Sequence, residues 1–287
     1  MADPLNGRHV RIGTGVRLWV EQFGEPDHPT VLLVMGANAP GLVWPDPLVE
    51  RLAARYHVVR YDHRDTGRSS RSEGAYSLRD LAADAIGILD ALGVDRAHVV
   101  GMSLGGVLVQ LLLLDHPQRL LSATVLATAA LGDGLADPSG TSDLPGPSAE
   151  LLEFWATMGA DRDVEAELDW RVEHWRILRG TGPFDPAEFR ALEERVMRHS
   201  GETRQPTAHA TADQGGLERG AELAGNRVPT LVVEAPLDPI NPPPHAENLR
   251  AVIGSSTLVR IAGMGHALSS DVLPDLGTAL LRHLDAH

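Results

Sequence analysis

AHVVGMSLGGVLVQLLLL, residues 97–114, is the stretch that decides the fold of this chain. It opens as an apolar run typical of a buried strand, turns through Gly101-Met102-Ser103-Leu104-Gly105, and continues as an apolar helix. A G-x-S-x-G turn between a strand and a helix is typical of a nucleophile elbow, which exposes a serine hydroxyl above the edge of a sheet. Ser103 is therefore the candidate nucleophile. The alternative is a glycine-rich turn that contains an incidental serine.

Strand-like and helix-like segments alternate on both sides of this stretch. The apolar runs that predict strands occupy residues 30–35, 57–61, 98–100, 122–128, 230–234 and 257–261. The patterns that predict helices lie near 45–55, 77–92, 104–114 and 243–253, and from about 270. Residues 8–13 and 16–23 predict an opening hairpin. This alternation predicts an α/β fold, with a mainly parallel sheet covered by helices on both faces.

The alternation stops at residue 130 and returns near residue 229. Residues 131–147 are rich in Gly, Pro, Asp and Ser, which predicts a loop, and residues 148–199 show helix patterns without strand signals. We expect residues 1–130 and 228–287 to form one α/β core and residues 131–227 to form a helical cap inserted into it.

Aromatic residues are concentrated in the predicted cap. The whole chain has 5 Trp, 3 Tyr and 4 Phe, and half of them lie between residues 154 and 189. Most of these rings should form the core of the cap, but one or two that face a cleft would suit a flat apolar substrate. Phe154, Trp175 and Phe184 are the candidate substrate contacts, although sequence alone does not decide which rings face the cleft.

Composition and charge narrow the class of partner. The formal net charge of −14 argues against a nucleic acid or an anionic membrane surface as the main partner. The chain has no cysteine, which excludes disulfides, thiolate metal sites and a cysteine nucleophile. Neither a signal peptide in MADPLNGRHV nor a membrane-length apolar run is visible. We expect a cytoplasmic monomer or weak oligomer that acts on a small molecule.

A serine nucleophile needs a base, and the base needs an acid that orients it. In a sheet of this kind the acid and then the histidine follow the serine in the sequence, each just after a strand. Asp238 follows the run 230–234, and His266 follows the run 257–261. The alternatives are a turn aspartate before a proline and a loop histidine. Asp133, which follows an earlier predicted strand, is the rival acid.

Two backbone N–H groups should form an oxyanion hole. One belongs to Leu104, the residue after the serine, and the other to Ala37, just beyond the strand run 30–35. The neighbouring Asn38 is either a turn-forming asparagine or a substrate contact.

A metal site is not expected. Glu234, Asp238 and His245 could be grouped as a metal cluster, but Pro236 and the prolines at 242–244 make a shared coordination sphere unfavourable. The charged loop 62–69 is interpreted as a structural loop held by its own hydrogen bonds, because no glycine-lysine element typical of a phosphate loop follows a strand. We expect no cofactor.

These motifs together resemble the α/β-hydrolases and, more closely, the anthracycline methylesterases. The segments that carry the resemblance cover nearly the whole chain in order: VLLVMGAN, RYDHRDTGRS, DRAHVVGMSLGG, LPGP, WRILRGTGPFD, PTLVVEAPLDPI and IAGMGHAL. LPGP and WRILRGTGPFD are the specific ones because they lie in the cap, whereas core motifs are shared by hydrolases of every activity. One departure is Ala37, where the similar enzymes can have a second glycine; a backbone donor survives this change.

The resemblance implies hydrolysis of the carbomethoxy methyl ester of an anthracycline glycoside, a flat aromatic polyketide, to the free acid and methanol in antibiotic biosynthesis. It implies Ser103 as nucleophile, His266 as base, Asp238 as its acid, and Ala37 and Leu104 as oxyanion donors. Whether the acid then loses carbon dioxide stays open. A lactonase, thioesterase or peptidase would use the same triad. A dehalogenase or epoxide hydrolase is disfavoured, because it would have Asp in place of Ser103. Ligand receptors and cofactor-free oxygenases of this fold are the non-hydrolytic alternatives.

Overall fold

The computed structural model describes residues 7–13, 15–134, 137 and 142–287. Most of the N-terminal segment used in the signal-peptide argument, the tip of the first hairpin at Thr14, and part of the loop predicted at 131–147 lie outside the described residues. No described helix has the length and the apolar character that are needed to cross a membrane.

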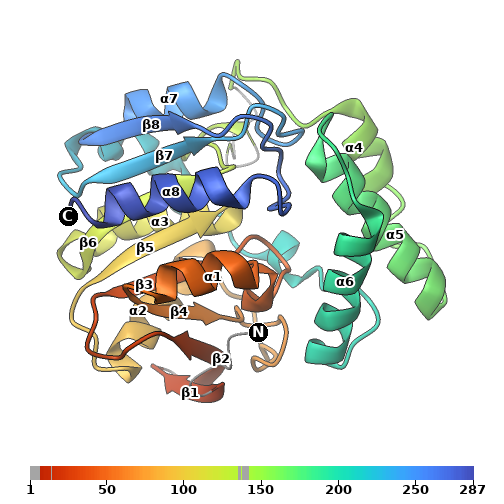
Figure 1. Ribbon diagram of the computed structural model, residues 1–287, viewed down its shortest axis with the longest axis horizontal. Coiled ribbons are helices and arrows are strands. Elements are labelled where there is room, and N and C mark those ends of the chain that lie inside the picture. Colours follow the sequence, from red (N-terminus) through yellow and green to blue (C-terminus); the bar gives the residue numbers. More distant parts are fainter. Residues whose placement is uncertain (1–6, 14, 135–136, 138–141) are drawn as a thin grey trace.

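A twisted eight-stranded sheet forms the centre of the described structure (Figure 1). Its strands are β1 (Arg8–Ile12), β2 (Val16–Phe23), β3 (Thr30–Val34), β4 (His57–Tyr61), β5 (Ala97–Met102), β6 (Leu120–Leu126), β7 (Thr230–Glu234) and β8 (Ser256–Arg260). Their spatial order is β1-β2-β4-β3-β5-β6-β7-β8. The pairs β1·β2 and β2·β4 are antiparallel, and all pairs from β4·β3 to β7·β8 are parallel. The predicted hairpin and the mainly parallel sheet are confirmed.

The described α-helices are α1 (Asp46–Ala53), α2 (Leu78–Ala91), α3 (Leu104–Asp115), α4 (Ala149–Trp155), α5 (Val164–Arg179), α6 (Pro186–Ser200), α7 (His245–Val252) and α8 (Leu273–Leu284). Helices α1 and α8 cover one face of the sheet, and α2, α3 and α7 cover the other. The strands read as continuous apolar runs because both of their faces are buried. In β3, Val31 and Leu33 face α1 and α8, whereas Leu32 and Val34 face α2 and α3.

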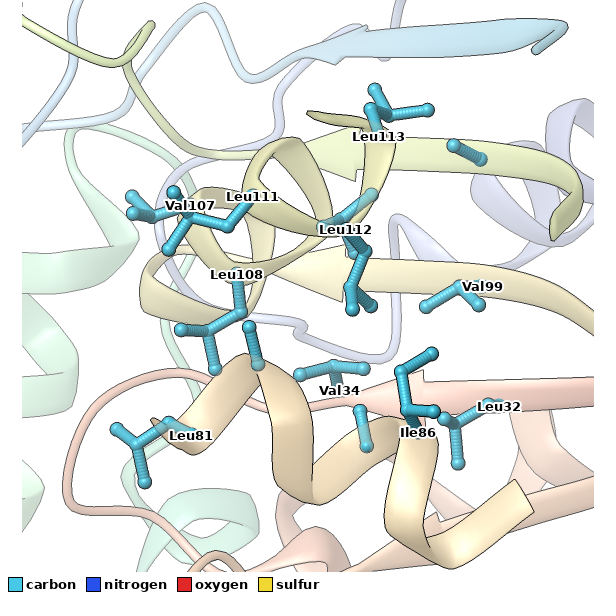
Figure 2. Close-up of a cluster of buried hydrophobic side chains, with 14 of the residues drawn as sticks. Leu32, Val34, Leu81, Ile86, Val99, Val107, Leu108, Leu111, Leu112 and Leu113 are labelled. Carbon is cyan, nitrogen blue, oxygen red and sulfur yellow. The ribbon is translucent and has the colours of Figure 1, made fainter. Parts of the chain in front are cut away.

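Helix α3 is apolar almost all round because it is buried almost all round. Figure 2 shows Val107, Leu108, Leu111 and Leu112 of this helix in one buried cluster with side chains of α2 and of the strands. The helix that carries the predicted elbow at its N-terminus is therefore held rigidly in the core. A movement of that N-terminus would require repacking of the whole cluster.

Element ends differ from the sequence-based expectation by at most three residues, and the shift of β6 has a physical reason. The run 122–128 predicted a strand, but β6 covers Leu120–Leu126. The chain leaves the sheet at Ala127, whose backbone has a φ of +48°, outside the extended region. Residues 127 and 128 are nevertheless buried, which is why they look like strand in the sequence. Ser77 and Asp80 form a capping box at the start of α2.

Helices α4, α5 and α6 form a separate layer beside the carboxyl ends of the strands, on the right in Figure 1. Helices α5 and α6 pack on each other, and Asp185 caps α6 by accepting from the N–H of Ala187 at 2.9 Å. Two 3₁₀ segments, Ala208–Thr211 and Leu217–Gly225, lead the chain back to β7. We refer to α4–α6 as the cap.

Candidate active site

Ser103 lies between β5 and α3 with backbone angles φ +55° and ψ −121°, which few non-glycine residues adopt. Its N–H donates to the carbonyl of Leu126 at 3.0 Å. A Cβ at Gly101 would come within 2.2 Å of the carbonyl oxygen of Gly105, and a Cβ at Gly105 would come within 2.1 Å of the carbonyl oxygen of Val34. The spacing G-x-S-x-G therefore follows from the close approach of β5, α3 and β3 around the turn.

His266 and Asp238 meet in a buried hydrogen bond. The distance from His266 Nδ1 to Asp238 Oδ2 is 2.9 Å. The other carboxylate oxygen of Asp238 accepts from the N–H groups of Ile240 at 2.8 Å and Asn241 at 3.1 Å. Both side chains are buried, with 5% of His266 and 2% of Asp238 exposed. A carboxylate fixed in this way holds the imidazole with its proton on Nδ1 and leaves Nε2 able to accept one.

Ser103 and His266 share one cavity of about 400 Å³ that lies between the core and the cap. The loops after β3 and β5 supply Gly36, Ala37 and Ser103, and the loop after β8 supplies His266. This is the crevice at the carboxyl ends of the strands, beside the reversal of strand order between β3 and β5, where open α/β sheets bind ligands. The volume lies within the usual range for a small-molecule site, about 300–1,000 Å³.

Of the two expected oxyanion donors, Ala37 lines this cavity, and Leu104 directly follows Ser103 at the start of α3. In the described part of the chain, no hydrogen bond takes up the N–H of Ala37 or of Leu104. A Cβ at Gly36 would come within 3.2 Å of Ser103 Cβ, so the loop after β3 is in close contact with the elbow. Two free N–H groups beside a serine hydroxyl can accept the charge of a tetrahedral intermediate.

Asn38 is held by a residue that sequence reasoning missed, His209. The N–H of Asn38 donates to His209 Nδ1 at 2.9 Å, and Asn38 Oδ1 accepts from the N–H of His209 at 3.2 Å. His209 Nε2 donates to the carbonyl of Arg64 at 3.1 Å. Asn38 has a φ of +60°, as expected of a turn-forming asparagine, and it also lines the cavity. No motif marks His209, because its partners are distant in the sequence.

The cap rings are arranged differently from the expectation. Trp175 lines the cavity, but Phe154 and Phe184 do not belong to its lining. Phe154 stacks on Trp170 with ring centroids 4.8 Å apart, and Phe184 stacks on Phe189 at 5.1 Å. Both rings therefore pack within the cap. Trp155 and Phe189, which the sequence analysis did not single out as contacts, line the cavity together with Met158.

A buried ionic cluster lies in the cap wall of the cavity. Arg171 Nη1 donates to Glu193 at 3.1 Å and Arg171 Nε donates to Glu167 at 3.1 Å, while the indole N–H of Trp175 donates to Glu193 at 2.6 Å. These contacts satisfy the charged groups and fix the Trp175 ring against the cavity. The cluster is a rigid wall rather than a free charge that could bind an ion.

Within the described residues, the rival acid Asp133 is not hydrogen-bonded to His266, and the residues that suggested a metal site are not grouped as ligands. Asp133 accepts from Ser142 Oγ at 2.7 Å and from Asn248 Nδ2 at 2.7 Å, and no hydrogen bond joins it to His266 within the described residues. Among the described residues, no three His, Asp or Glu side chains are grouped so that they could hold a metal ion. In the loop 62–69, Asp62 accepts from the N–H groups of Gly41 and Arg68 at 2.9 and 2.8 Å, which fits a structural loop.

The chain is similar to known proteins over most of its length. The family model described as the alpha/beta hydrolase fold matches residues 29–271. The chain is 44% identical over 285 residues to the rhodomycin D methylesterase DauP of Streptomyces sp. strain C5, and 42% identical to the rhodomycin D methylesterase DnrP of Streptomyces peucetius. Each alignment covers 94% of this chain and 96% of the relative, so the cap is included.

A solved structure of similar shape is a hydrolase from Pseudomonas aeruginosa, with a TM-score of 0.71 and 26% identity. That alignment covers 98% of this chain and 99% of the other. The α/β architecture expected from the sequence is thus confirmed by strand order, by the family model and by a solved relative. The chain belongs to the α/β-hydrolase fold family and, within it, to the family of the anthracycline methylesterases.

Proposed function

We propose that this protein is a serine carboxylesterase that hydrolyses the carbomethoxy methyl ester of an anthracycline glycoside to the free acid and methanol. The observation that carries the proposal is the shared cavity. Ser103 on its strained turn, Ala37 and His266, which is hydrogen-bonded to Asp238, all line it, beneath a cap that aligns with rhodomycin D methylesterases. The two relatives' names supply the substrate class.

The mechanism follows from the roles of these groups. His266 Nε2 removes the hydroxyl proton as Ser103 Oγ attacks the ester carbonyl, and Asp238 stabilises the resulting imidazolium through Nδ1–H. The N–H groups of Ala37 and Leu104 hold the oxyanion. Collapse of the intermediate breaks the bond to the methoxy group, which leaves as methanol with the proton from His266. Water activated by the same histidine then cleaves the acyl-enzyme and releases the acid.

The shape of the cavity supports a flat aromatic substrate over a small ester. Trp155, Trp175 and Phe189 line its cap side, and Leu42, Val43 and Met102 line its core side. Flat aromatic rings gain affinity from stacking on such walls. No nucleic acid is expected at a protein with a net charge of −14. Lactonase, thioesterase and peptidase activities use the same catalytic groups and are the competing assignments.

Mass spectrometry of rhodomycin D after incubation with the purified protein tests the proposal. We expect a product lighter by one methylene group, formed together with one equivalent of methanol. Loss of the whole carbomethoxy group without a detectable acid would mean that decarboxylation is coupled to hydrolysis in the site. Unchanged rhodomycin D, with a simple aryl ester still cleaved, would contradict the substrate assignment and leave a serine hydrolase of another specificity.

A further inference from the structure

A second histidine, His174 of α5, lines the same cavity and has no role in the mechanism above. Its ring packs against aromatic side chains of the cap. Phe154 stacks on it with centroids 5.6 Å apart, and Trp170 lies tilted against it at 5.5 Å. Trp155 approaches edge-on, and its indole Nε1 lies 2.9 Å from His174 Nε2. The orientation of the imidazole is therefore fixed before any substrate binds.

The contact with Trp155 also fixes where the His174 proton sits. An indole N–H can only donate, so His174 Nε2 must accept and carries no proton. A neutral imidazole then carries its proton on Nδ1. Burial, with a smaller contribution from nearby His266, lowers the pKa of His174 to about 4, so that the ring is neutral at neutral pH.

The Nδ1–H group has no partner within the described residues, in contrast to its neighbours in the cavity wall. The carboxylate of Glu193 accepts from both Trp175 and Arg171, and Glu188 accepts from Ser270. His174 is partly accessible, and its unpaired Nδ1 atom is itself not fully buried. The cavity thus contains an oriented, uncharged N–H donor close to the candidate base.

We propose that His174 is a specificity-determining residue, which donates its Nδ1–H to an uncharged oxygen acceptor, a carbonyl or hydroxyl oxygen, on the polyketide ester. This inference rests on the proposed function and adds the chemistry by which the apolar cavity would select its substrate. A site that offers a fixed donor discriminates against analogues that lack the matching oxygen, because the donor is then left unpaired. The neutral ring also avoids a strong ion pair with the acid product.

Nitrogen-15 NMR of the histidine-labelled protein tests the tautomer without any substrate. We expect His174 at pH 7 to show a protonated Nδ1 and an unprotonated Nε2, and we expect W155F to lose this preference because the donor to Nε2 is gone. A proton on Nε2 in the unchanged protein, or an imidazolium, would overturn the proposal.

Kinetics on rhodomycin D then test the role. H174F keeps a flat ring but removes the donor, whereas H174N retains an N–H donor near the position of Nδ1. We expect kcat/KM for rhodomycin D, relative to that for p-nitrophenyl acetate, to fall about tenfold to a hundredfold in H174F, mostly through KM, and to recover in large part in H174N.

His283 of α8 provides the matched control. It is also a buried histidine whose pKa is lowered to about 4, but its Nε2 hydrogen-bonds the carbonyl of Ala123, away from the cavity. H283Q should lower the thermal midpoint without changing the kinetic ratio. An unchanged ratio in H174F, or an equal loss in H174F and H174N, would contradict the role of His174. The proposed function would be unaffected, because it is judged on the product formed by the unchanged protein.

Discussion

At the scale of single residues, the loop that carries Ala37 is held by a contact between Asn38 and His209, which are 171 positions apart in the sequence. His209 Nδ1 accepts from the backbone N–H of Asn38, and the backbone N–H of His209 donates to Asn38 Oδ1. The next residue toward the strand is Ala37, the expected oxyanion donor. His209 therefore acts as a positioning residue: it touches no reacting atom, but it holds the Ala37–Asn38 peptide, which directly follows the peptide that carries the Ala37 N–H.

Replacing His209 should reduce the rate of the chemical step more than it weakens substrate binding. In H209L the N–H of Asn38 loses its acceptor, and we expect kcat to fall about tenfold or more, up to the roughly hundredfold to thousandfold loss typical of removing one oxyanion donor, while KM changes little. H209N, whose amide oxygen can replace Nδ1 as acceptor, should retain most of the activity. Steady-state kinetics with thermal melts check this. A KM effect alone would contradict the positioning role.

Candidate site residues could be predicted from sequence where they directly follow a strand. Asp238 and His266 come after β7 and β8, and parallel strands end at one edge of the sheet, so their meeting could be anticipated. His209 could not be anticipated, because a loop histidine that bonds a remote backbone N–H leaves no periodic signal. The same holds for the tautomer of His174, which depends on a single indole of another helix.

At the scale of elements, the C-terminal end of α5 joins the cap to the loops that carry the histidine and the acid. The N–H of His266 donates to the carbonyl of Leu178 at 2.7 Å, and Arg179, fully buried, donates to the carbonyl of Gly263 and to Asp271. A Cβ at Gly180 would come within 2.2 Å of the carbonyl oxygen of Leu237. The motif WRILRG thus lies where the cap is attached to the core.

The cap also shows the limit of pattern reading. Helical spacing indicates which residues share one face of a helix, but not which partner that face meets. Phe154 and Phe184 were therefore expected at the substrate and instead pack on other rings within the cap, while Trp155 and Phe189 line the cavity. In the core the ambiguity does not arise, because a buried parallel strand has covered faces on both sides.

At the scale of the whole molecule, several buried histidines make stability depend on pH. Burial lowers the pKa of His63 to about 3 and the pKa values of His98 and His283 to about 4, against an ordinary value of 6.5. These groups stay neutral in the folded chain at pH values where the unfolded chain binds protons. Their contribution to stability is therefore complete above pH 6.5 and is lost as the pH falls toward about 4.

We accordingly expect the urea midpoint of the protein to fall steadily between pH 7 and pH 5. One unit of pKa shift corresponds to about 1.4 kcal/mol, so a few such histidines remove a substantial part of the free energy of unfolding. H283Q removes one of these groups and should show a smaller loss over the same range. Urea titrations at pH 7, 6 and 5 measure this. A midpoint that does not change with pH in either protein would contradict the assignment.

The proposed esterase activity requires that Ser103, at the strained turn between β5 and α3, is the nucleophile. The most direct test is the kcat/KM of S103A on rhodomycin D, measured beside the unchanged protein, with binding followed by quenching of tryptophan fluorescence. We predict a loss of about four orders of magnitude or more in kcat/KM with binding retained, because one triad member carries most of the catalysis. Turnover by S103A within tenfold of the unchanged protein would contradict the account.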